Sequence, residues 1–457
     1  MIVHQYYLEC LSHASYLVGD ETSGTAVVID PRRDVGEYVA DAEELGLRIT
    51  HVINTHLHAD FLSGHHELSA ATGAEMVFGK SAPVEFPAML VADGSWIEMG
   101  HVRLQVLETP GHTPESICIT AYEGPDATEP YCVFTGDTLF IGDVGRPDLL
   151  ASVGVTADEL GRMLYASLHT KLIPLPDEVL VYPAHGAGSA CGKNLSTETM
   201  STMRDQRALN YALQPMSEDD FVAIVTDGQP AAPPYFVYDA ITNRKERALF
   251  DEQAEITAMS LLELDQALAD GAVLIDTRQA TDFAAGHLIG SVNVGLDGRF
   301  AEYAGSVVEP HSPIVLVCEE EAEREAVTRL ARIGFDNVIG FLQQPHQVMA
   351  EHPERTEHAS RLTVDQLQDI MANVPDVQLV DIRNPGELSV GVISPAKMLP
   401  LGSLMRQLGE LDPSRPTVVY CAGGYRSSAG ASLLRTHGFA DVSDLLGGYA
   451  AWEAIAG

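Results

Sequence analysis

The sequence has little basic charge and no long apolar run. It contains 27 Lys and Arg residues against 65 Asp and Glu residues, and its formal net charge is −38 at pH 7. This charge repels a phosphate backbone and an anionic membrane surface, so we expect no nucleic acid and no membrane among its partners. No apolar run approaches the roughly 18 residues that cross a bilayer. The first residues lack the basic and apolar regions of an export signal, which favours a cytoplasmic protein.

Cysteine is scarce as well, with six residues in 457 and no Cys-x-x-Cys pair. This number and spacing argue against a disulfide framework. Apolar residues make up 46% of the chain and charged residues 20%, so each part can bury a core and bulk disorder is not expected. A chain of 457 residues is too long for one core, and we predict about two to four domains.

Two kinds of unit follow one another along the chain. Up to about residue 245, apolar runs alternate with helical patterns, which is typical of a layered α/β domain. The remainder repeats itself after roughly 100 residues, and each copy has a strand ending in Asp-x-Arg, a strand ending in Cys and a helix ending in Gly-Phe. The predicted domains are residues 1–245, 257–345 and 359–457, and we expect the charged stretch 244–255 to be a linker.

Four segments of the first domain place His or Asp just beyond an apolar strand, with Gly or Pro in the turn. They are Thr55–Asp60, Thr109–Thr113, Phe134–Thr138 and Tyr182–Gly186. Any one of them alone is more often an ordinary surface or capping segment. Loops at strand ends carry functional side chains on a rigid scaffold, and His and carboxylate groups are common metal ligands. Together the four segments predict a metal site.

A second chemical motif begins where the predicted strand Thr417–Tyr420 ends. Cys421 lies between this strand and a helix, where backbone N–H groups and the helix dipole favour a thiolate or persulfide over a thiol. Gly423 and Gly424 let the loop curl so that these N–H groups point inward, and Arg426 adds a cation. Most free cysteines are inert packing residues, but this surrounding pattern predicts a reactive Cys421.

The middle copy lacks this pattern. Its loop reads Cys318-Glu319-Glu320-Glu321, with no glycine to permit the curl and with carboxylates that repel a sulfur anion. We expect Cys318 to be inert, and the middle domain to be a structural spacer or a docking surface.

The ordered motifs H-x-H-x-D (56–60), P-G-H-T (110–113), T-G-D (135–137) and P-A-H (183–185) resemble the metallo-β-lactamase fold. Within that fold, their longer contexts are similar to the persulfide dioxygenases. The two C-terminal copies resemble rhodanese domains. The resemblance implies an α/β multidomain chain, with an αββα sandwich followed by two three-layer α/β rhodanese domains.

The same resemblance implies one Fe²⁺ per chain, held by His56, His112 and Asp137. Two imidazoles and one carboxylate suit ferrous iron and leave coordination positions open. Other side chains would orient these ligands and accept hydrogen bonds. They are His58, Asp60 and His185. Phe61 stands where two-metal members carry a further His ligand, and this favours a single metal.

The resemblance also suggests substrate-binding and sulfur-carrying residues. Arg146 would fix a thiol carrier's carboxylate through a bidentate pair. Tyr182 and Cys191, near the His185 turn, are further candidates for the wall of a substrate pocket. In the last domain the predicted catalytic residues are Cys421 as persulfide carrier, Arg426 and Asp381, and Gly423 and Gly424 belong to the anion cradle.

The implied function is oxidation of a small thiol persulfide, glutathione-type or other, by O₂ to sulfite and thiol. Transfer of sulfane sulfur from Cys421 to sulfite would then give thiosulfate, as part of sulfide detoxification. The family also implies a homo-oligomer. One alternative is a zinc thioester hydrolase of the glyoxalase II type with regulatory rhodanese domains, which Phe61 disfavours. Another is a non-catalytic sulfur sensor, which the intact set of metal-capable residues disfavours.

Overall fold

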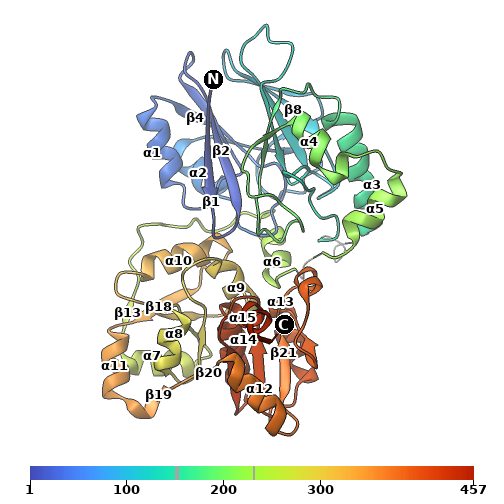
Figure 1. The fold of residues 1–457 in the computed structure, drawn as a ribbon. Helices are drawn as coiled ribbons and strands as arrows, with labels where there is room; N and C mark the ends of the chain where they lie inside the picture. The colour runs from blue at the N-terminus through green and yellow to red at the C-terminus, as the bar shows by residue number, and fades with distance from the viewer. Residues whose placement is uncertain (150–153, 230–231, 457) are drawn as a thin grey trace. The chain divides into compact units, whose positions relative to one another are not determined.

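The computed structural model describes residues 1–149, 154–229 and 232–456 (Figure 1). It separates into two compact units. The first comprises Met1–Pro230 and Phe236–Glu252, and the second comprises Ala231–Tyr235 and Gln253–Gly457. Among the described residues, no helix combines the length and the apolar character that a membrane span needs.

The first unit is built on two six-stranded sheets. The first sheet consists, in spatial order, of β1 (Ile2–Leu8), β2 (His13–Asp20), β3 (Thr25–Ile29), β4 (Arg48–Ile53), β5 (Glu75–Gly79) and β6 (Met89–Val91). The second consists of β12 (Ser201–Thr202), β11 (Leu180–Pro183), β10 (Cys132–Gly136), β9 (Ile117–Tyr122), β8 (Arg103–Glu108) and β7 (Trp96–Glu98).

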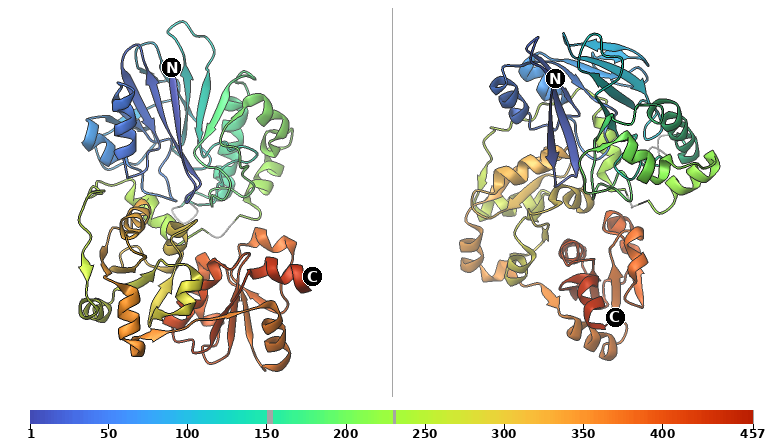
Figure 2. Two further views of the ribbon diagram at one scale, coloured as in Figure 1. Left: turned by 60° about the vertical axis from the view of Figure 1, so that its left-hand side comes forward. Right: turned by 45° about the horizontal axis from the view of Figure 1, so that its top comes forward.

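Helices cover the outer face of each sheet. They are α1 (Gly36–Glu44) and α2 (His65–Thr72) on the first sheet, and α3 (Ala157–Ser167), α4 (Met203–Leu209) and α5 (Glu218–Thr226) with the second. Helix α6 (Tyr235–Thr242) follows them in the chain. In both views of Figure 2 the blue helices and the green helices lie on opposite sides of the strands. The predicted αββα sandwich is confirmed.

Alternation along the strands explains this layering. In β3, Val27 and Ile29 belong to the core between the two sheets, whereas Ala26 and Val28 belong to the core under α1 and α2. Successive side chains of a strand point to opposite faces, so an all-apolar strand serves two cores at once. The β-branched run at this position therefore suits a sheet that is covered on both sides.

The second unit contains two five-stranded parallel sheets with the same strand order. The middle copy has β13 (Ala258–Met259), β18 (Val338–Leu342), β17 (Ile314–Val317), β14 (Val273–Asp276) and β16 (Ser291–Asn293). The last copy has β20 (Ser360–Leu362), β24 (Val442–Leu445), β23 (Thr417–Tyr420), β21 (Gln378–Asp381) and β22 (Ala396–Met398). A two-stranded sheet of β15 (His287–Leu288) and β19 (Thr356–Glu357) lies outside them.

Each parallel sheet is covered by helices, as parallel sheets require. The middle copy has α7 (Leu261–Ala269), α8 (Ala280–Ala285), α9 (Phe300–Val307), α10 (Glu323–Arg332) and α11 (Pro345–Glu351). The last copy has α12 (Val364–Asn373), α13 (Leu401–Leu404), α14 (Arg426–Thr436) and α15 (Gly448–Ala456). Helices α7 and α12 both begin with a capping box, at Ser260 and Thr363, so the duplication extends to the helix-start signal.

Candidate functional site

The predicted metal ligands come together from three loops at the ends of β4, β8 and β10. His56, His112 and Asp137 each offer a donor atom within 4.8 Å of the other two, and all three are buried. Asp137 Oδ2 lies 3.9 Å from His56 Nε2 and 3.5 Å from His112 Nε2. Among the described residues, neither His56 Nε2 nor Asp137 Oδ2 has a hydrogen-bond partner. Buried polar atoms normally have one, so this donor set fits a bound metal ion.

The atoms of these ligands that face away from the metal position are also held. His112 Nδ1 lies 2.9 Å from the backbone oxygen of Arg146, so Nδ1 carries the proton and Nε2 is left as the donor atom. Asp137 Oδ1 lies 2.7 Å from His185 Nδ1. Burial lowers the pKa of His56 well below its usual value, which favours the neutral imidazole that a metal binds.

Asp30, which the sequence analysis missed, anchors the loop after β4. Its carboxylate accepts hydrogen bonds from the backbone N and from Oγ1 of Thr55, both at 2.8 Å, and lies 2.9 Å from His58 Nε2. Thr55 Oγ1 is in turn 3.0 Å from His56 Nδ1. Asp30 directly follows β3, so the pattern that identified the other segments, an acidic residue just beyond an apolar strand, was present here too.

His185 lies between two carboxylates. Its Nδ1 is 2.7 Å from Asp137 Oδ1, and its Nε2 is 2.7 Å from Asp60 Oδ2. Burial opposes a charge on this imidazole, but Asp137 and Asp60 outweigh it and raise the pKa of His185 well above its usual value. The two buried carboxylates thus favour the protonated form of this ring.

Asp60, His185 and Cys191 form a second group of donor atoms within 4.8 Å of one another. Both nitrogens of His185 already face carboxylates, and burial raises the pKa of the Cys191 thiol well above its usual value. A protonated thiol is a poor metal ligand, because the thiolate is the form that binds. Phe61, whose ring lies 4.3 Å from that of His58, brings no further donor. The second group therefore offers a weaker donor set than His56, His112 and Asp137 do.

His13 is a further buried histidine that the sequence analysis missed. It forms an isolated β-bridge with His185, and its ring centroid lies 4.2 Å from that of Phe61. Burial lowers the pKa of His13 well below its usual value, so it is neutral. The sequence offered one signal for His13, which is a histidine at the start of a strand of mostly apolar or small residues.

Arg146 and Tyr182 were predicted to face the substrate. The Arg146 guanidinium makes a bidentate pair with Asp148, at 2.7 and 2.6 Å, and is itself buried. The ring of Tyr182 packs between the sheets, 5.5 Å from that of Phe134. In this structure Arg146 positions His112 through its backbone oxygen, and Tyr182 is a core residue; substrate contact by either stays a prediction.

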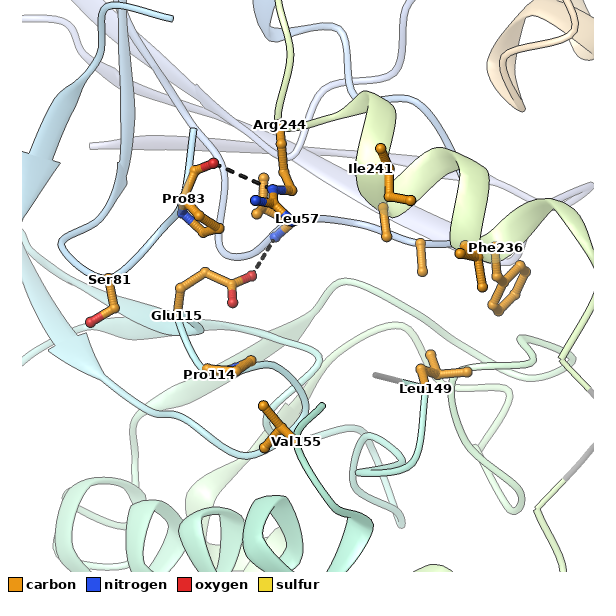
Figure 3. A pocket seen from close by; sticks show the side chains of 13 residues that line it. Leu57, Ser81, Pro83, Pro114, Glu115, Leu149, Val155, Phe236, Ile241 and Arg244 are labelled. Carbon is orange, nitrogen blue, oxygen red and sulfur yellow. Dashed lines mark hydrogen bonds between the residues drawn. The ribbon is translucent and has the colours of Figure 1, made fainter. Parts of the chain in front are cut away.

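A cavity of about 210 Å³ lies beside the metal-binding loop (Figure 3). Its lining includes Leu57 and Ala59, which alternate with the histidines of the H-x-H-x-D motif. Most of the other lining residues are apolar. They are Pro83, Pro114, Leu149, Val155, Phe236, Val237, Ala240 and Ile241, with Ser81, Glu115 and Arg244 as the polar members. Glu115 accepts a hydrogen bond of 3.0 Å from the backbone N of Leu57, so the cavity wall and the metal-binding loop are directly connected.

The chain segment directly after α6 packs on the first unit and holds the metal-binding loop. Asn243 is buried, and its Nδ2 donates to the backbone oxygens of His58 and Phe61, both at 2.8 Å. Its Oδ1 accepts from the backbone N of Ser63 at 3.0 Å. Four residues later, Arg247 Nη2 lies 2.8 Å from Glu67 Oε2. Residues near the C-terminal end of the first unit therefore fix the backbone of the loop that follows His56.

In the last domain, Cys421 is buried at the end of β23. The backbone N–H of Gly424 donates to its Sγ at 3.1 Å. Gly424 has a φ of +92°, in the region that favours glycine, as the predicted curl requires. A Cβ on Gly448 would lie 2.3 Å from the backbone oxygen of Cys421, so the Gly-Gly turn before α15 allows the loop to pack closely. No hydrogen bond involving Gly423 is among the described contacts.

Both charged residues predicted to assist Cys421 have carboxylate or guanidinium partners. Arg426 makes a bidentate pair with Glu387, at 2.7 and 2.5 Å. Asp381 pairs with Arg383 at 2.6 Å, deep in the domain. The middle copy has the same pair, Asp276 with Arg278. In both copies the Asp-x-Arg motif thus forms an ion pair that stabilises the turn at the end of a strand. A direct role of Asp381 at the sulfur stays a prediction.

One expectation for the middle copy is wrong. Its loop curls without glycine, because Glu321 adopts a φ of +67° at the position that corresponds to Gly424. Gln344, at the position of Gly447, has a φ of +52°. Non-glycine residues occupy this region at a cost of about 1 kcal/mol or more. Burial raises the pKa of Cys318 to about 12, so its thiol is protonated, which agrees with an inert residue.

Comparisons with known proteins agree with this architecture. The metallo-beta-lactamase superfamily model matches residues 8–76 and 93–185, and the rhodanese-like domain model matches residues 260–344 and 363–455. The chain is 34% identical over 213 residues to human mitochondrial persulfide dioxygenase ETHE1, covering 46% of this chain and 75% of that protein.

Two further relatives resemble the first unit, and the match to one of them extends beyond it. A hydroxyacylglutathione hydrolase of Rhodospirillum rubrum is 32% identical over 256 residues, covering 54% of this chain and 89% of the hydrolase. A crystal structure of a metallo-beta-lactamase from Staphylococcus aureus subsp. aureus COL superimposes with a TM-score of 0.68 at 32% identity. That match covers 75% of this chain and 99% of the Staphylococcus chain.

Replacing Asn243 tests whether it holds the metal-binding loop. We expect Asn243→Ala to lower the free energy of unfolding of the first unit by about 1–3 kcal/mol, because buried carbonyls lose their donor. It should also reduce metal bound after dialysis. Gln378→Ala, which removes similar amide bonds to Asp412 in the second unit, is the matched control and should leave metal content unchanged. Equal metal content in both variants would contradict the assignment.

Proposed function

Since the chain belongs to the metallo-beta-lactamase superfamily, as a homologue of the persulfide dioxygenases followed by rhodanese-like domains, we propose that it oxidises a small thiol persulfide and transfers sulfane sulfur. The observation that carries this proposal is the buried His56–His112–Asp137 group, which lacks a further His ligand at position 61. The resident metal that we propose is one Fe²⁺.

The donor chemistry supports iron. When bound, a ferrous ion in this two-His-one-carboxylate set would leave coordination positions open and would supply the redox chemistry by which O₂ reacts with a persulfide. The chain's own contribution is to orient the donor atoms, with His112 held by the Arg146 backbone and Asp137 held by His185. Burial of all these groups excludes bulk water from the reacting sulfur.

The proposed overall reaction is R–S–SH + O₂ + H₂O → R–SH + SO₃²⁻ + 2H⁺. The S–S bond of the persulfide breaks: its outer sulfur is oxidised to sulfite, its inner sulfur is reduced to the thiol, and O₂ takes up the net electrons released. The thiol leaves with one proton, and the remaining protons go to solvent. We propose that the R group of the persulfide binds in the apolar cavity lined by Leu57, Phe236 and Ile241. Arg244, which also lines this cavity, is the cation available to an anionic R group.

The second proposed step takes place at Cys421. A persulfide passes its outer sulfur to the thiol, R–S–SH + Cys–SH → R–SH + Cys–S–SH, and sulfite then removes it, Cys–S–SH + SO₃²⁻ → Cys–SH + S₂O₃²⁻. One S–S bond breaks as another forms in each exchange, so no external oxidant is needed. The N–H of Gly424, at 3.1 Å from Sγ, stabilises negative charge on the sulfur.

The second candidate function is thioester hydrolysis. It is favoured by the hydroxyacylglutathione hydrolase relatives, which share the fold of the first unit. It would require a zinc-activated water and, in its two-metal form, a ligand that Phe61 does not provide. Metal analysis separates the two functions: one Fe per chain with O₂ uptake on persulfides supports the dioxygenase, and two Zn with thioester cleavage supports the hydrolase.

We expect His112→Ala to lose the metal and to reduce O₂ uptake with glutathione persulfide at least about 100-fold, because even residues that only orient ligands contribute up to that factor. Thiosulfate-to-cyanide sulfur transfer should remain, since it depends on the other unit. Oxygen uptake is measured with an electrode on anaerobically reconstituted protein. Undiminished uptake in the variant would refute this ligand assignment.

We expect Cys421→Ser to abolish transfer of sulfur from thiosulfate to cyanide, because a hydroxyl cannot carry the sulfane sulfur. The variant should keep its full iron content and its O₂ uptake. Cys318→Ser, which replaces the equivalent thiol of the middle copy, is the matched control and should transfer sulfur like the unaltered protein. Retained transfer in Cys421→Ser would exclude Cys421 as the carrier.

A further inference from the structure

The two rhodanese-like copies share a buried polar contact inside the second unit. Helix α14, which begins directly after the Cys421 loop, packs on β16 of the middle copy. Asn293, the last residue of β16, donates its backbone N–H to Ser432 Oγ at 2.9 Å. Its side-chain Oδ1 accepts from Ser428 Oγ at 2.6 Å. All three residues are buried.

The middle copy fixes Asn293 in turn. The side-chain Nδ2 donates to the backbone oxygens of Asp276 and Arg278, at 3.1 and 2.8 Å. Backbone oxygens can only accept, so these two bonds determine which way the amide points. Every polar atom of the Asn293 side chain is used, and the turn that holds it is the middle copy's own Asp-x-Arg motif. A fully satisfied buried network defines one position for the helix it contacts.

A second contact reaches the Cys421 loop itself. The hydroxyl of Tyr425 donates to the backbone oxygen of Gly295, and the Tyr425 ring lies 5.3 Å from that of Tyr303 on α9. A Cβ at Gly295 would lie 3.2 Å from the Tyr425 ring, so a glycine permits this close approach. Tyr425 directly follows Gly424, the residue whose N–H faces Cys421 Sγ. The loop is thus held by the middle copy on both sides of the start of α14.

We propose that the middle rhodanese-like domain is the positioning element of the Cys421 site, acting through Asn293 on α14 and through Gly295 on Tyr425. Its own loop is unsuited to sulfur chemistry, yet it contacts Tyr425 and α14, which directly follow Gly424, whose N–H donates to the sulfur of the last domain. The role rests on the proposed function of Cys421. A displacement of these donors weakens stabilisation of the bound sulfur anion, because hydrogen bonds depend steeply on geometry.

The test uses full-length Ser428→Ala, with Ser443→Ala as the matched control. Both serines are buried in the last copy, and each makes a side-chain bond of 2.6–2.7 Å, Ser428 to Asn293 and Ser443 to Ser360. Loss of one hydrogen bond corresponds to roughly a fivefold effect. We expect Ser428→Ala to raise the KM for thiosulfate about fivefold with a smaller change in kcat, and to slow alkylation of Cys421 by iodoacetamide. Ser443→Ala should change neither.

A double-mutant cycle with Asn293→Ala assigns the effect to this contact. We expect the double variant to have the same KM for thiosulfate as Asn293→Ala alone, because both changes remove one interaction. Additive effects of Ser428→Ala and Asn293→Ala on the KM for thiosulfate would overturn the positioning role. The same KM in Ser428→Ala and Ser443→Ala would overturn it as well. If unaltered protein and Cys421→Ser transfer sulfur equally, the proposed carrier function fails instead, and the two failures are distinguishable. Thermal unfolding of each variant, followed by circular dichroism, checks that the second unit is folded.

Discussion

The carboxylate of Asp137 is the interaction on which the first unit's site depends. One of its oxygens lies against protonated His185, and the other points at the two imidazoles that complete the candidate metal site. A buried carboxylate without a compensating cation is costly, so the position of each neighbour is constrained by charge as well as by packing. His185 and a metal ion together supply that compensation. The Asp137–His185–Asp60 chain therefore explains how two acids can be buried at the candidate metal site.

The fold brings this cluster together because strand ends of both sheets meet at one edge. β4 of the first sheet and β8, β10 and β11 of the second each deliver one segment. Two contacts from more distant parts of the sequence then fix the loop after β4. Asp30 holds it from the preceding strand, and Asn243 holds it from the chain segment beyond α6. Ligand geometry is thus a property of the whole domain rather than of the H-x-H-x-D motif.

The sequence predicted the parts of the site that follow a local rule. His56, His112 and Asp137 each come shortly after an apolar strand, and alternation and duplication predicted a layered α/β domain followed by a tandem repeat. The αββα sandwich, the rhodanese domains and the choice of ligands were implied by the family resemblance. His13 and Asn243 were missed because their importance lies in contacts with residues far away in the chain, whereas Asp30 followed the local rule and was overlooked. The curl of the Cys318 loop was wrongly excluded, because local preference against a left-handed Glu321 is about 1 kcal/mol and the surrounding fold outweighs it.

The pattern around an arginine does not reveal whether its guanidinium is free to bind an anion. Arg146 and Arg426 were both predicted to bind an anionic group, yet each is paired with a carboxylate, Asp148 and Glu387. In a chain with a net charge of −38, an acidic residue is readily available to any buried guanidinium. An incoming anion must then displace that carboxylate or bind elsewhere. Backbone N–H groups at a helix start carry no counter-ion, so the Cys421 loop is suited to hold a sulfur anion without breaking an existing ion pair.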